Sequence, residues 1–212
     1  MENKISPDFK AAATPDLTTA RGLDSVTVVT WGDSIANFIG INLKNVFNNV
    51  VNLGRNGAGL DNVLPALPLE NVPAGAAVIM SMSGNDIELM IGKPQSAIDN
   101  YAARLVEMAV KVRENGATPV ILGHASLTAP YTGSVPGGVS HWAEEGFMEK
   151  WIITMTRVND AVSKAAAAEN ISWSKVEGRI PADERSQDNL HYTTRGSHRI
   201  AQNALTDAGI RF

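Results

Sequence analysis

Five short apolar runs, rich in β-branched residues, constrain the fold of this chain more than any other feature of its sequence. They lie at residues 26–30, 49–53, 76–82, 119–123 and 171–173, and the last is the weakest. A continuous apolar run is typical of a strand buried on both faces of a parallel sheet, whereas a strand with one face in water alternates polar and apolar residues. The runs therefore predict a five-stranded parallel sheet.

Segments with helical periodicity separate several of these runs. In residues 96–114 apolar side chains recur every three or four positions, with Ser96 as the expected N-cap and Asn115-Gly116 as the expected stop. Similar spacing predicts helices at about residues 146–168 and 194–208. Because strands that alternate with helices form right-handed βαβ crossovers, the predicted fold is a doubly wound α/β structure.

One connection is too long for an ordinary turn. Residues 124–145 contain glycines, prolines and aromatic residues without a clear period. Loops beyond about 12 to 15 residues are uncommon in compact domains and often carry function. We interpret this segment as a cap over a site, and its candidate substrate contacts are His124, Tyr131, His141 and Trp142.

Composition excludes several classes of function. A net charge of -4 gives no electrostatic footprint for nucleic acid or anionic lipid. The absence of cysteine excludes disulfides, thiolate metal sites and a cysteine nucleophile, and the four histidines show no HxxxH or HExxH spacing. We therefore expect neither a metal site nor a nucleic-acid partner.

The 212 residues suit one sizeable domain, which we place at residues 26–212, after a polar N-terminal arm at residues 1–25. The arm has no apolar core of a secretory signal, and no run approaches the roughly 18 to 20 apolar residues that cross a bilayer. A cytoplasmic location without membrane contact is the default expectation. A component of a phage or of an export system is the alternative.

Four polar or glycine-rich segments lie where a ligand site is expected. Gly32-Asp33-Ser34 follows the first apolar run, residues 52–59 (NLGRNGAG) follow the second, residues 83–86 (SGND) follow the third, and residues 188–191 (DNLH) precede the last helix. Ligands of open α/β sheets bind beyond the carboxyl ends of the strands. We therefore expect the four segments to converge.

These segments contain the parts that a hydroxyl nucleophile needs. Ser34 can attack a carbonyl carbon if His191 accepts its proton, and Asp188 can orient the imidazole of His191 from three residues away. The backbone N–H groups of Ser34 and Gly57 and the side-chain amide of Asn85 are candidate donors to the oxyanion that forms.

In their order along the chain, the four segments resemble the four blocks of the SGNH (GDSL-type) hydrolase superfamily. The resemblance spans residues 32–191. It implies a flavodoxin-like three-layer α/β/α sandwich with five parallel strands, and ester hydrolysis without a metal or organic cofactor. It also implies a nucleophilic role for Ser34, a base and its orienting acid at His191 and Asp188, and oxyanion donors at Ser34, Gly57 and Asn85.

The chain departs from the family pattern in three places. No residue stands between Gly84 and Asn85, where the family has one, and Tyr192 follows the histidine where proline is frequent. The interval between Ser34 and Gly57 is short for the family, which suggests a trimmed first crossover and a more open acyl pocket. Short acyl groups, acetyl especially, on small-molecule or glycan esters are the expected substrates.

The sequence also allows other interpretations of these residues. Ser34 taken alone is more often a helix N-cap, and the glycines of residues 54–59 can form a phosphate loop, although their pattern is GxxGxG and not GxGxxG. We interpret Asp33 and Asp86 as scaffold residues. The alternative functions are a small acyl-thioesterase, a non-catalytic carbohydrate-binding or assembly module, and a nucleotide-binding protein; a homo-oligomer is also open.

Overall fold

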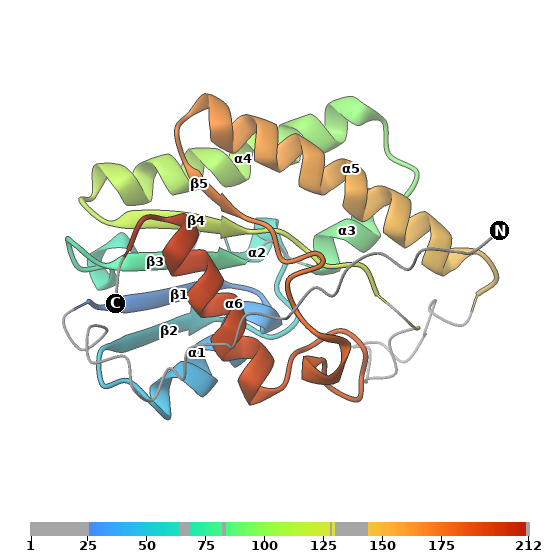
Figure 1. The fold of residues 1–212 in the computed structure, drawn as a ribbon. Coiled ribbons are helices and arrows are strands. Elements are labelled where there is room, and N and C mark those ends of the chain that lie inside the picture. The colour runs from blue at the N-terminus through green and yellow to red at the C-terminus, as the bar shows by residue number, and fades with distance from the viewer. Residues whose placement is uncertain (1–25, 64–67, 82–83, 128, 130–143, 211–212) are drawn as a thin grey trace, which may run out of the picture.

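Five parallel strands form one sheet in the order β2-β1-β3-β4-β5 (Figure 1). The computed structural model describes residues 26–63, 68–81, 84–127, 129 and 144–210. The strands are β1 (Val28–Gly32), β2 (Val50–Gly54), β3 (Ala77–Ser81), β4 (Thr118–Leu122) and β5 (Ser172–Ser174). The predicted five-stranded parallel sheet is therefore confirmed.

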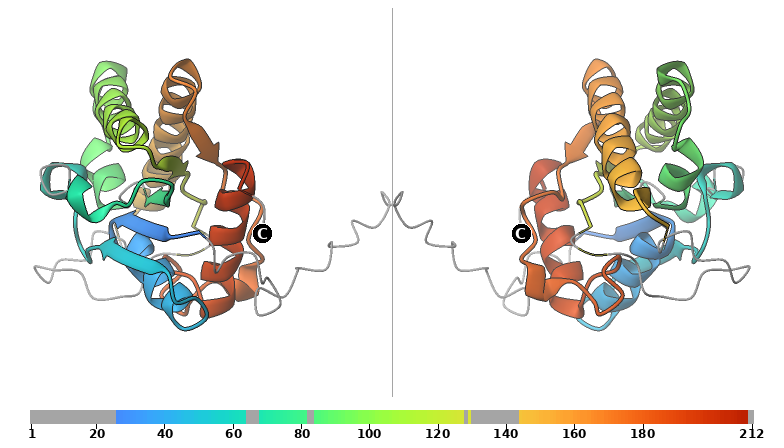
Figure 2. Two further views of the ribbon diagram at one scale, coloured as in Figure 1. Left: turned by 90° about the vertical axis from the view of Figure 1, so that its left-hand side faces the viewer. Right: turned by 90° about the vertical axis from the view of Figure 1, so that its right-hand side faces the viewer.

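Helices cover both faces of the sheet, which makes three layers (Figure 2). The long helices are α1 (Ser34–Lys44), α4 (Gln95–Glu114), α5 (Phe147–Ala168) and α6 (Thr194–Asp207). The short helices α2 (Leu60–Val63) and α3 (Gly84–Met90) and the 3-10 turns η4 (Leu69–Asn71) and η6 (Ala182–Glu184) were not predicted. The α/β/α sandwich is as the sequence predicts.

Alternate residues of each central strand face opposite helix layers. In β3, Val78 and Met80 belong to the core beneath α4 and α5, whereas Ala77 and Ile79 belong to the core beneath α1 and α6. All five residues of β3 are buried, because both faces of the strand are covered. This double burial is the physical reason why the strands are continuous apolar runs in the sequence.

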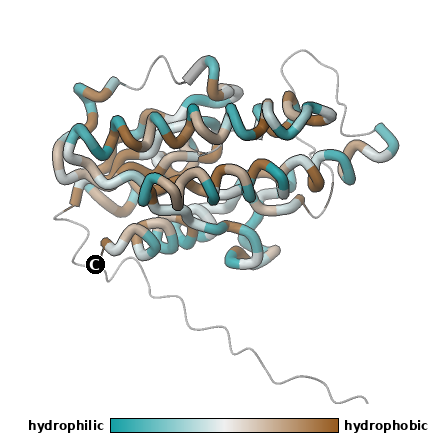
Figure 3. Tube along the Cα trace, turned by 90° about the horizontal axis from the view of Figure 1, so that it is seen from above, coloured by the Kyte–Doolittle hydropathy of each residue, from teal (hydrophilic) through white to brown (hydrophobic). Residues whose placement is uncertain are grey.

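The outer helices are amphipathic, as their spacing predicts. Figure 3 shows polar and apolar residues alternating along the two long helices nearest the viewer, α4 and α5. In α4 the buried side chains include Ile98, Leu105 and Val112, at helical spacing. Within the part of the chain that the structure describes, no helix is both long and apolar enough to cross a bilayer.

The predicted N-cap of α4 is wrong, and the predicted stop is confirmed. The capping position belongs to Pro94, with φ of -64° and no side-chain cap bond, and Ser96 lies inside the first turn. Proline before the first turn starts the helix through its fixed φ, without a side-chain acceptor. At the other end Asn115 is the C-cap, and Gly116 has the left-handed φ of +82°.

The first strand runs two residues further than predicted and ends at Gly32. This glycine has φ of +136°, and a Cβ built on it would lie 2.6 Å from the carbonyl oxygen of Ser81. Both the conformation and the close approach to β3 need a residue without a side chain. Gly32 thus lets the chain turn into α1 directly against the end of β3.

We predict that Gly32→Ala lowers the free energy of unfolding by about 3 kcal/mol or more, because backbone strain and a clash act together. Gly75→Ala is the matched control, since Gly75 also has a positive φ (+79°) but nothing lies within 4 Å of its Cβ position. The control should lose only about 1 kcal/mol. Urea denaturation of both variants is the measurement, and equal losses would contradict the argument.

Candidate active site

Three side chains from two ends of the chain form a line of close contacts at the carboxyl edge of the sheet. The hydroxyl of Ser34 lies 2.8 Å from Nε2 of His191, and Nδ1 of His191 lies 2.5 Å from Oδ2 of Asp188. In such a line the imidazole can accept the proton of the hydroxyl, while the carboxylate fixes the tautomer that carries hydrogen on Nδ1. The structure thus brings together the three residues that the sequence singled out for this chemistry.

The turn that carries Asp188 and His191 is organised by the carboxylate itself. Its Oδ1 atom accepts the backbone N–H groups of Leu190 (3.1 Å) and His191 (3.0 Å) and the hydroxyl of Ser186. Asn189 adopts the left-handed φ of +66° that closes the turn. One carboxylate oxygen therefore shapes the turn, and the other contacts the imidazole.

Asp188 is ionised at neutral pH. Burial by itself would raise the pKa of this carboxyl group, but the hydrogen bonds from Ser186 and His191 outweigh it and lower the pKa to about 2. An ionised carboxylate stabilises the positive charge that the imidazole gains when it takes a proton.

Ser34 is the first residue of α1, and the N-cap is Asp33. Oδ1 of Asp33 accepts the backbone N–H groups of Ile35 (2.9 Å) and Ala36 (3.4 Å). The interpretation of Ser34 as a mere N-cap is therefore wrong, because its neighbour takes that role and its own hydroxyl contacts His191. Its backbone N–H lies at the positive end of the helix dipole.

Phe38 contacts the imidazole from one helical turn beyond Ser34. The ring centroids of Phe38 and His191 lie 4.8 Å apart at an interplanar angle of 58°. Phe38 was not among the predicted site residues, although its spacing of four from Ser34 places both on one face of α1. Phe38 limits the positions that the imidazole can adopt.

Asp33 also connects α1 to the end of β3 and to α3. Its carboxylate is 2% exposed and accepts the hydroxyl of Ser81 (2.8 Å) and the backbone N–H of Gly84 (3.0 Å). These bonds bring the first turn of α3, which carries Asn85, next to the first turn of α1, which carries Ser34. The expectation that Asp33 bonds to nearby backbone agrees with this geometry.

The glycine segment, residues 54–60, runs between α1 and α3. At its start the N–H of Arg55 donates to the carbonyl oxygen of Gly32 (2.9 Å), and in its middle the side-chain amide of Asn85 donates to the carbonyl oxygen of Ala58 (3.1 Å). Gly57 has φ of +70°, and nothing lies within 4 Å of its Cβ position. The expected oxyanion donors Gly57 and Asn85 thus belong to segments in direct contact.

Three asparagine side chains form a polar chain beside this segment. Asn52 donates to Oδ1 of Asn37 (2.9 Å), and Asn37 donates to Oδ1 of Asn56 (2.9 Å), the residue before Gly57. None of the three was among the predicted site residues. Their only sequence signal is that Asn37 lies one turn after Ser34 and that the other two lie near Gly57.

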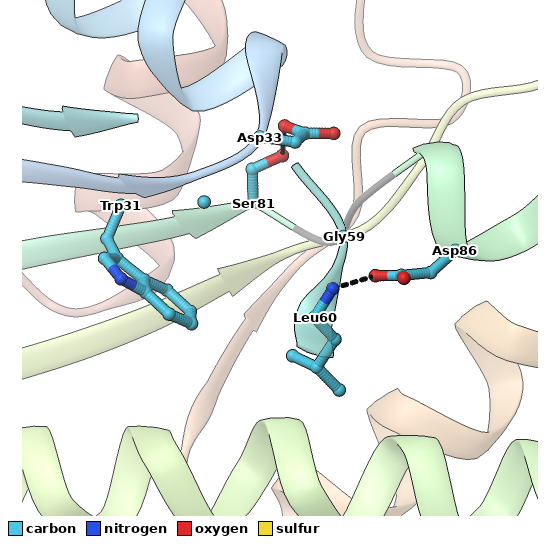
Figure 4. Close-up of a pocket in the computed structure, with 7 residues that line it drawn as sticks. Trp31, Asp33, Gly59, Leu60, Ser81 and Asp86 are labelled. Atoms are coloured by element: carbon cyan, nitrogen blue, oxygen red, sulfur yellow. Dashed lines mark hydrogen bonds between the residues drawn. The ribbon is translucent and has the colours of Figure 1, made fainter. Parts of the chain in front are cut away.

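Asp86 is a second buried carboxylate in this region (Figure 4). It is 6% exposed, and its Oδ2 accepts the backbone N–H of Leu60 (2.7 Å) and the hydroxyl of Tyr101 (3.3 Å). Burial raises the pKa of Asp86 to about 6, the negative charges of Asp33 and Asp61 add to this rise, and the two hydrogen bonds oppose it.

The candidate substrate contacts of the long connection are placed only in part. His124 is 4% exposed and packs edge-on against Trp151, with ring centroids 6.5 Å apart, and a Cβ on Gly84 would lie 3.7 Å from its Cε1. It therefore lies beside the first turn of α3, and its contact with substrate stays a prediction. Tyr131, His141 and Trp142 lie outside the described residues.

The residues that the structure describes include several acidic and histidine side chains near Ser34. They contain no group of three or more His, Cys, Asp or Glu side chains that could hold an ion.

A family model described as GDSL-like lipase/acylhydrolase matches residues 17–204, most of the chain. Together with the fold, this match defines the protein as an ester hydrolase of the SGNH class, as the four sequence segments predicted. The chain belongs to the GDSL-like lipase/acylhydrolase family. No curated protein sequence matches it significantly.

Solved structures with this fold include three that illustrate its range. A protein from Slackia heliotrinireducens described as of the SGNH hydrolase type is 23% identical, covers 84% of this chain and 96% of its own, and has a TM-score of 0.55. The acetylxylan esterase Axe2 from Geobacillus stearothermophilus has 15% identity, coverages of 89% and 96%, and a TM-score of 0.57. The carbohydrate acetylesterase Est24 from Sinorhizobium meliloti has 15% identity, coverages of 87% and 97%, and a TM-score of 0.60. At these identities the likeness establishes the fold.

We predict that Asp86 makes the protein less stable as the pH rises from about 4 to about 7.5. The pKa of Asp86 is about 6 in the folded state against 3.8 ordinarily, so the folded state binds more protons across this range. Stability from this group is therefore complete below pH 4 and lost as the pH passes 6, a change of up to about 3 kcal/mol.

Urea denaturation of wild type and Asp86→Asn at both pH values measures this effect. The variant should gain stability relative to wild type at the higher pH. Asp160→Asn is the control, because Asp160 is an exposed carboxylate paired with Lys164, and its profile should run parallel to wild type. A parallel profile for Asp86→Asn as well would contradict the prediction.

Proposed function

We propose that this protein is a serine esterase that removes short acyl groups, acetyl above all, from O-acylated carbohydrates through an acyl-enzyme on Ser34. The observation that carries the proposal is the line of contacts from the Ser34 hydroxyl through His191 to Asp188, at 2.8 and 2.5 Å. The 2.8 Å between Oγ of Ser34 and Nε2 of His191 is within the range in which a base takes a proton from a nucleophile.

Acylation begins when Oγ of Ser34 attacks the ester carbonyl carbon and gives its proton to Nε2 of His191. As the bond forms between Oγ and the carbonyl carbon, the π electrons of the carbonyl group move onto the carbonyl oxygen. When this tetrahedral intermediate collapses, the bond to the alcohol breaks, and His191 returns the proton to the leaving alkoxide. The products are the free alcohol and an ester on Ser34.

Deacylation repeats these steps with water. His191 takes a proton from water, the hydroxide attacks the acyl carbon, and the intermediate releases the carboxylic acid as His191 returns the proton to Oγ of Ser34. Asp188 remains an anion throughout and stabilises the imidazolium in both halves of the reaction.

The negative charge of each tetrahedral intermediate falls on the former carbonyl oxygen. We assign its stabilisation to the backbone N–H groups of Ser34 and Gly57 and to the side-chain amide of Asn85. The hydrogen bond from Asn85 to Ala58 fixes the plane of the Asn85 amide. Asp33 holds α3, the helix that carries Asn85, against α1 by accepting the N–H of Gly84. Donors that are already oriented need no reorganisation as the charge develops.

The polar surroundings of Ser34 support a hydroxylated leaving group. Asn37 on α1 and Asn56 on the glycine segment hydrogen-bond to each other near Ser34. Sugar hydroxyls can exchange hydrogen bonds with these amides. Fold neighbours named as acetylxylan esterase and carbohydrate acetylesterase support the same substrate class. A long acyl chain would instead require an extended apolar surface.

We predict that Ser34→Ala abolishes hydrolysis of p-nitrophenyl acetate, a loss of about 10⁴-fold or more in kcat, because no nucleophile remains. Ser163→Ala is the matched control, since the hydroxyl of Ser163 is exposed and only donates to its own helix. The control should keep wild-type activity.

A serine-reactive fluorophosphonate identifies the nucleophile independently of the substrate. Mass spectrometry should find the label on Ser34. Full hydrolysis by Ser34→Ala would refute the acyl-enzyme proposal. A folded protein that takes up no label and hydrolyses no ester but binds glycans would be a carbohydrate-binding module instead.

We predict that acetyl esters react faster than octanoyl esters, by at least about tenfold in kcat/KM, because the side chains of Asn37 and Asn56, among the residues that the structure describes, place polar amides beside Ser34. Initial rates on p-nitrophenyl acetate, butyrate and octanoate test this order, with acetylated xylan as the glycan substrate. An acetyl thioester tested beside them addresses the thioesterase alternative. A preference for octanoate would overturn the assignment of the acyl group.

A further inference from the structure

Asp86 is a buried carboxylate that the reaction itself does not use. It directly follows Asn85 on α3, but its side chain contacts a different part of the chain, the end of the glycine segment. Figure 4 shows its carboxylate pointing at the backbone N–H of Leu60, with Gly59 beside it.

Both oxygens of this carboxylate lie against the glycine segment. Oδ2 accepts the N–H of Leu60 at 2.7 Å, and a Cβ on Gly59 would lie 2.5 Å from Oδ1. Residue 59 must therefore lack a side chain for the backbone to approach so closely. The hydroxyl of Tyr101 donates to Oδ2 (3.3 Å) and limits the rotation of the carboxylate.

The glycine segment has two further attachments besides Asp86, one on each side of Gly57, and the bond from Leu60 to Asp86 follows the second of them. At its start Arg55 donates to Gly32, and in its middle Asn85 donates to Ala58. Gly57 itself, at φ of +70°, has an open Cβ position and adopts a conformation that glycine alone enters without strain. The position of its N–H therefore depends on how firmly the flanking residues are held.

We propose that Asp86 is a positioning residue of the oxyanion hole: by accepting the N–H of Leu60, it sets the path of residues 57–60 and so aims the N–H of Gly57 at the carbonyl oxygen of the ester on Ser34. This inference rests on the proposed esterase function. It makes α3 responsible for two donors, one directly through Asn85 and one through the segment that Asp86 holds.

A carboxylate suits this task better than a neutral side chain does. Hydrogen bonds from backbone N–H groups to a carboxylate are shorter and stronger than those between neutral groups. Among the residues that the structure describes, two donors reach the carboxylate of Asp86, whereas four reach that of Asp33. Burial of so poorly compensated a carboxylate costs stability, which is understandable if the bond to Leu60 serves the reaction.

The test separates turnover from substrate binding. We expect Asp86→Ala to lower kcat about 10- to 100-fold on p-nitrophenyl acetate, with KM within about twofold, because a displaced donor loses part of the ~10²- to 10³-fold effect of one oxyanion donor. Asn85→Ala provides the reference for the loss of a whole donor. Rates are expressed per folded molecule, from near-ultraviolet circular dichroism of the same samples.

The conservative variant Asp86→Asn should recover kcat to within about fivefold of wild type, because an amide oxygen can accept the N–H of Leu60. A merely structural role would change thermal stability without this split between kcat and KM. Asp61→Asn is the matched control, since Asp61 follows Leu60 directly but is exposed and paired with Arg104. It should keep wild-type kcat.

Tyr101→Phe tests the inference without altering Asp86 or the glycine segment. It removes the hydroxyl that donates to the carboxylate, and we expect a loss of about two- to fivefold in kcat at unchanged KM. If Asp86→Ala does not fold, Tyr101→Phe is the deciding variant. A wild-type kcat in Tyr101→Phe would then overturn the positioning role of Asp86.

Ser34→Ala in the same assay separates the two claims. An inactive Ser34→Ala together with wild-type kcat in folded Asp86→Ala would overturn the role of Asp86 and leave the esterase proposal standing. Full activity of Ser34→Ala would overturn the esterase proposal and, with it, the oxyanion role of Asp86.

Discussion

The carboxylate of Asp33 is the contact on which the geometry of the site depends. It accepts two N–H groups of the first turn of α1, the hydroxyl at the end of β3 and the first N–H of α3. Because it is buried, these bonds are protected from competition with water. A single side chain thus connects the helix that carries Ser34 to the helix that carries Asn85. Gly32 makes this possible by letting the chain turn against β3.

The two buried aspartates of the site, Asp33 and Asp86, differ in how well hydrogen bonds compensate their burial. Asp33 follows β1 and receives four donors, so its burial is well compensated. Asp86 receives two from the described part of the chain, and burial raises the pKa of its carboxyl group to about 6. The first joins regular elements to one another, whereas the second contacts an irregular segment. This difference is expected if the sheet supplies a rigid frame and the connecting segments supply the adjustable part of the site.

Much of the fold followed from the sequence, because burial on both faces of a parallel sheet leaves continuous apolar runs that need no knowledge of distant contacts. The convergence of Ser34, Asp188 and His191 was also expected, since parallel strands deliver their following segments to one edge. Contacts that depend on distances across the fold were missed. The reach of Asp86 to Leu60 leaves no local pattern, and the helical spacing of Phe38 and Asn37 from Ser34 does not show which side chains they contact. The cap of α1 is Asp33 and not Ser34, which depends on the bonds that its carboxylate accepts from the first turn.

Ser34 and His191 are separated by 157 residues, so they are synthesised at very different times. The serine leaves the ribosome early on the first crossover, but its base arrives on the turn before α6, which packs against α1. The contact between the two side chains is non-local and requires that this turn has been synthesised and has packed beside α1. A chain that ends before residue 188 therefore lacks the base and the carboxylate that contact the hydroxyl of Ser34.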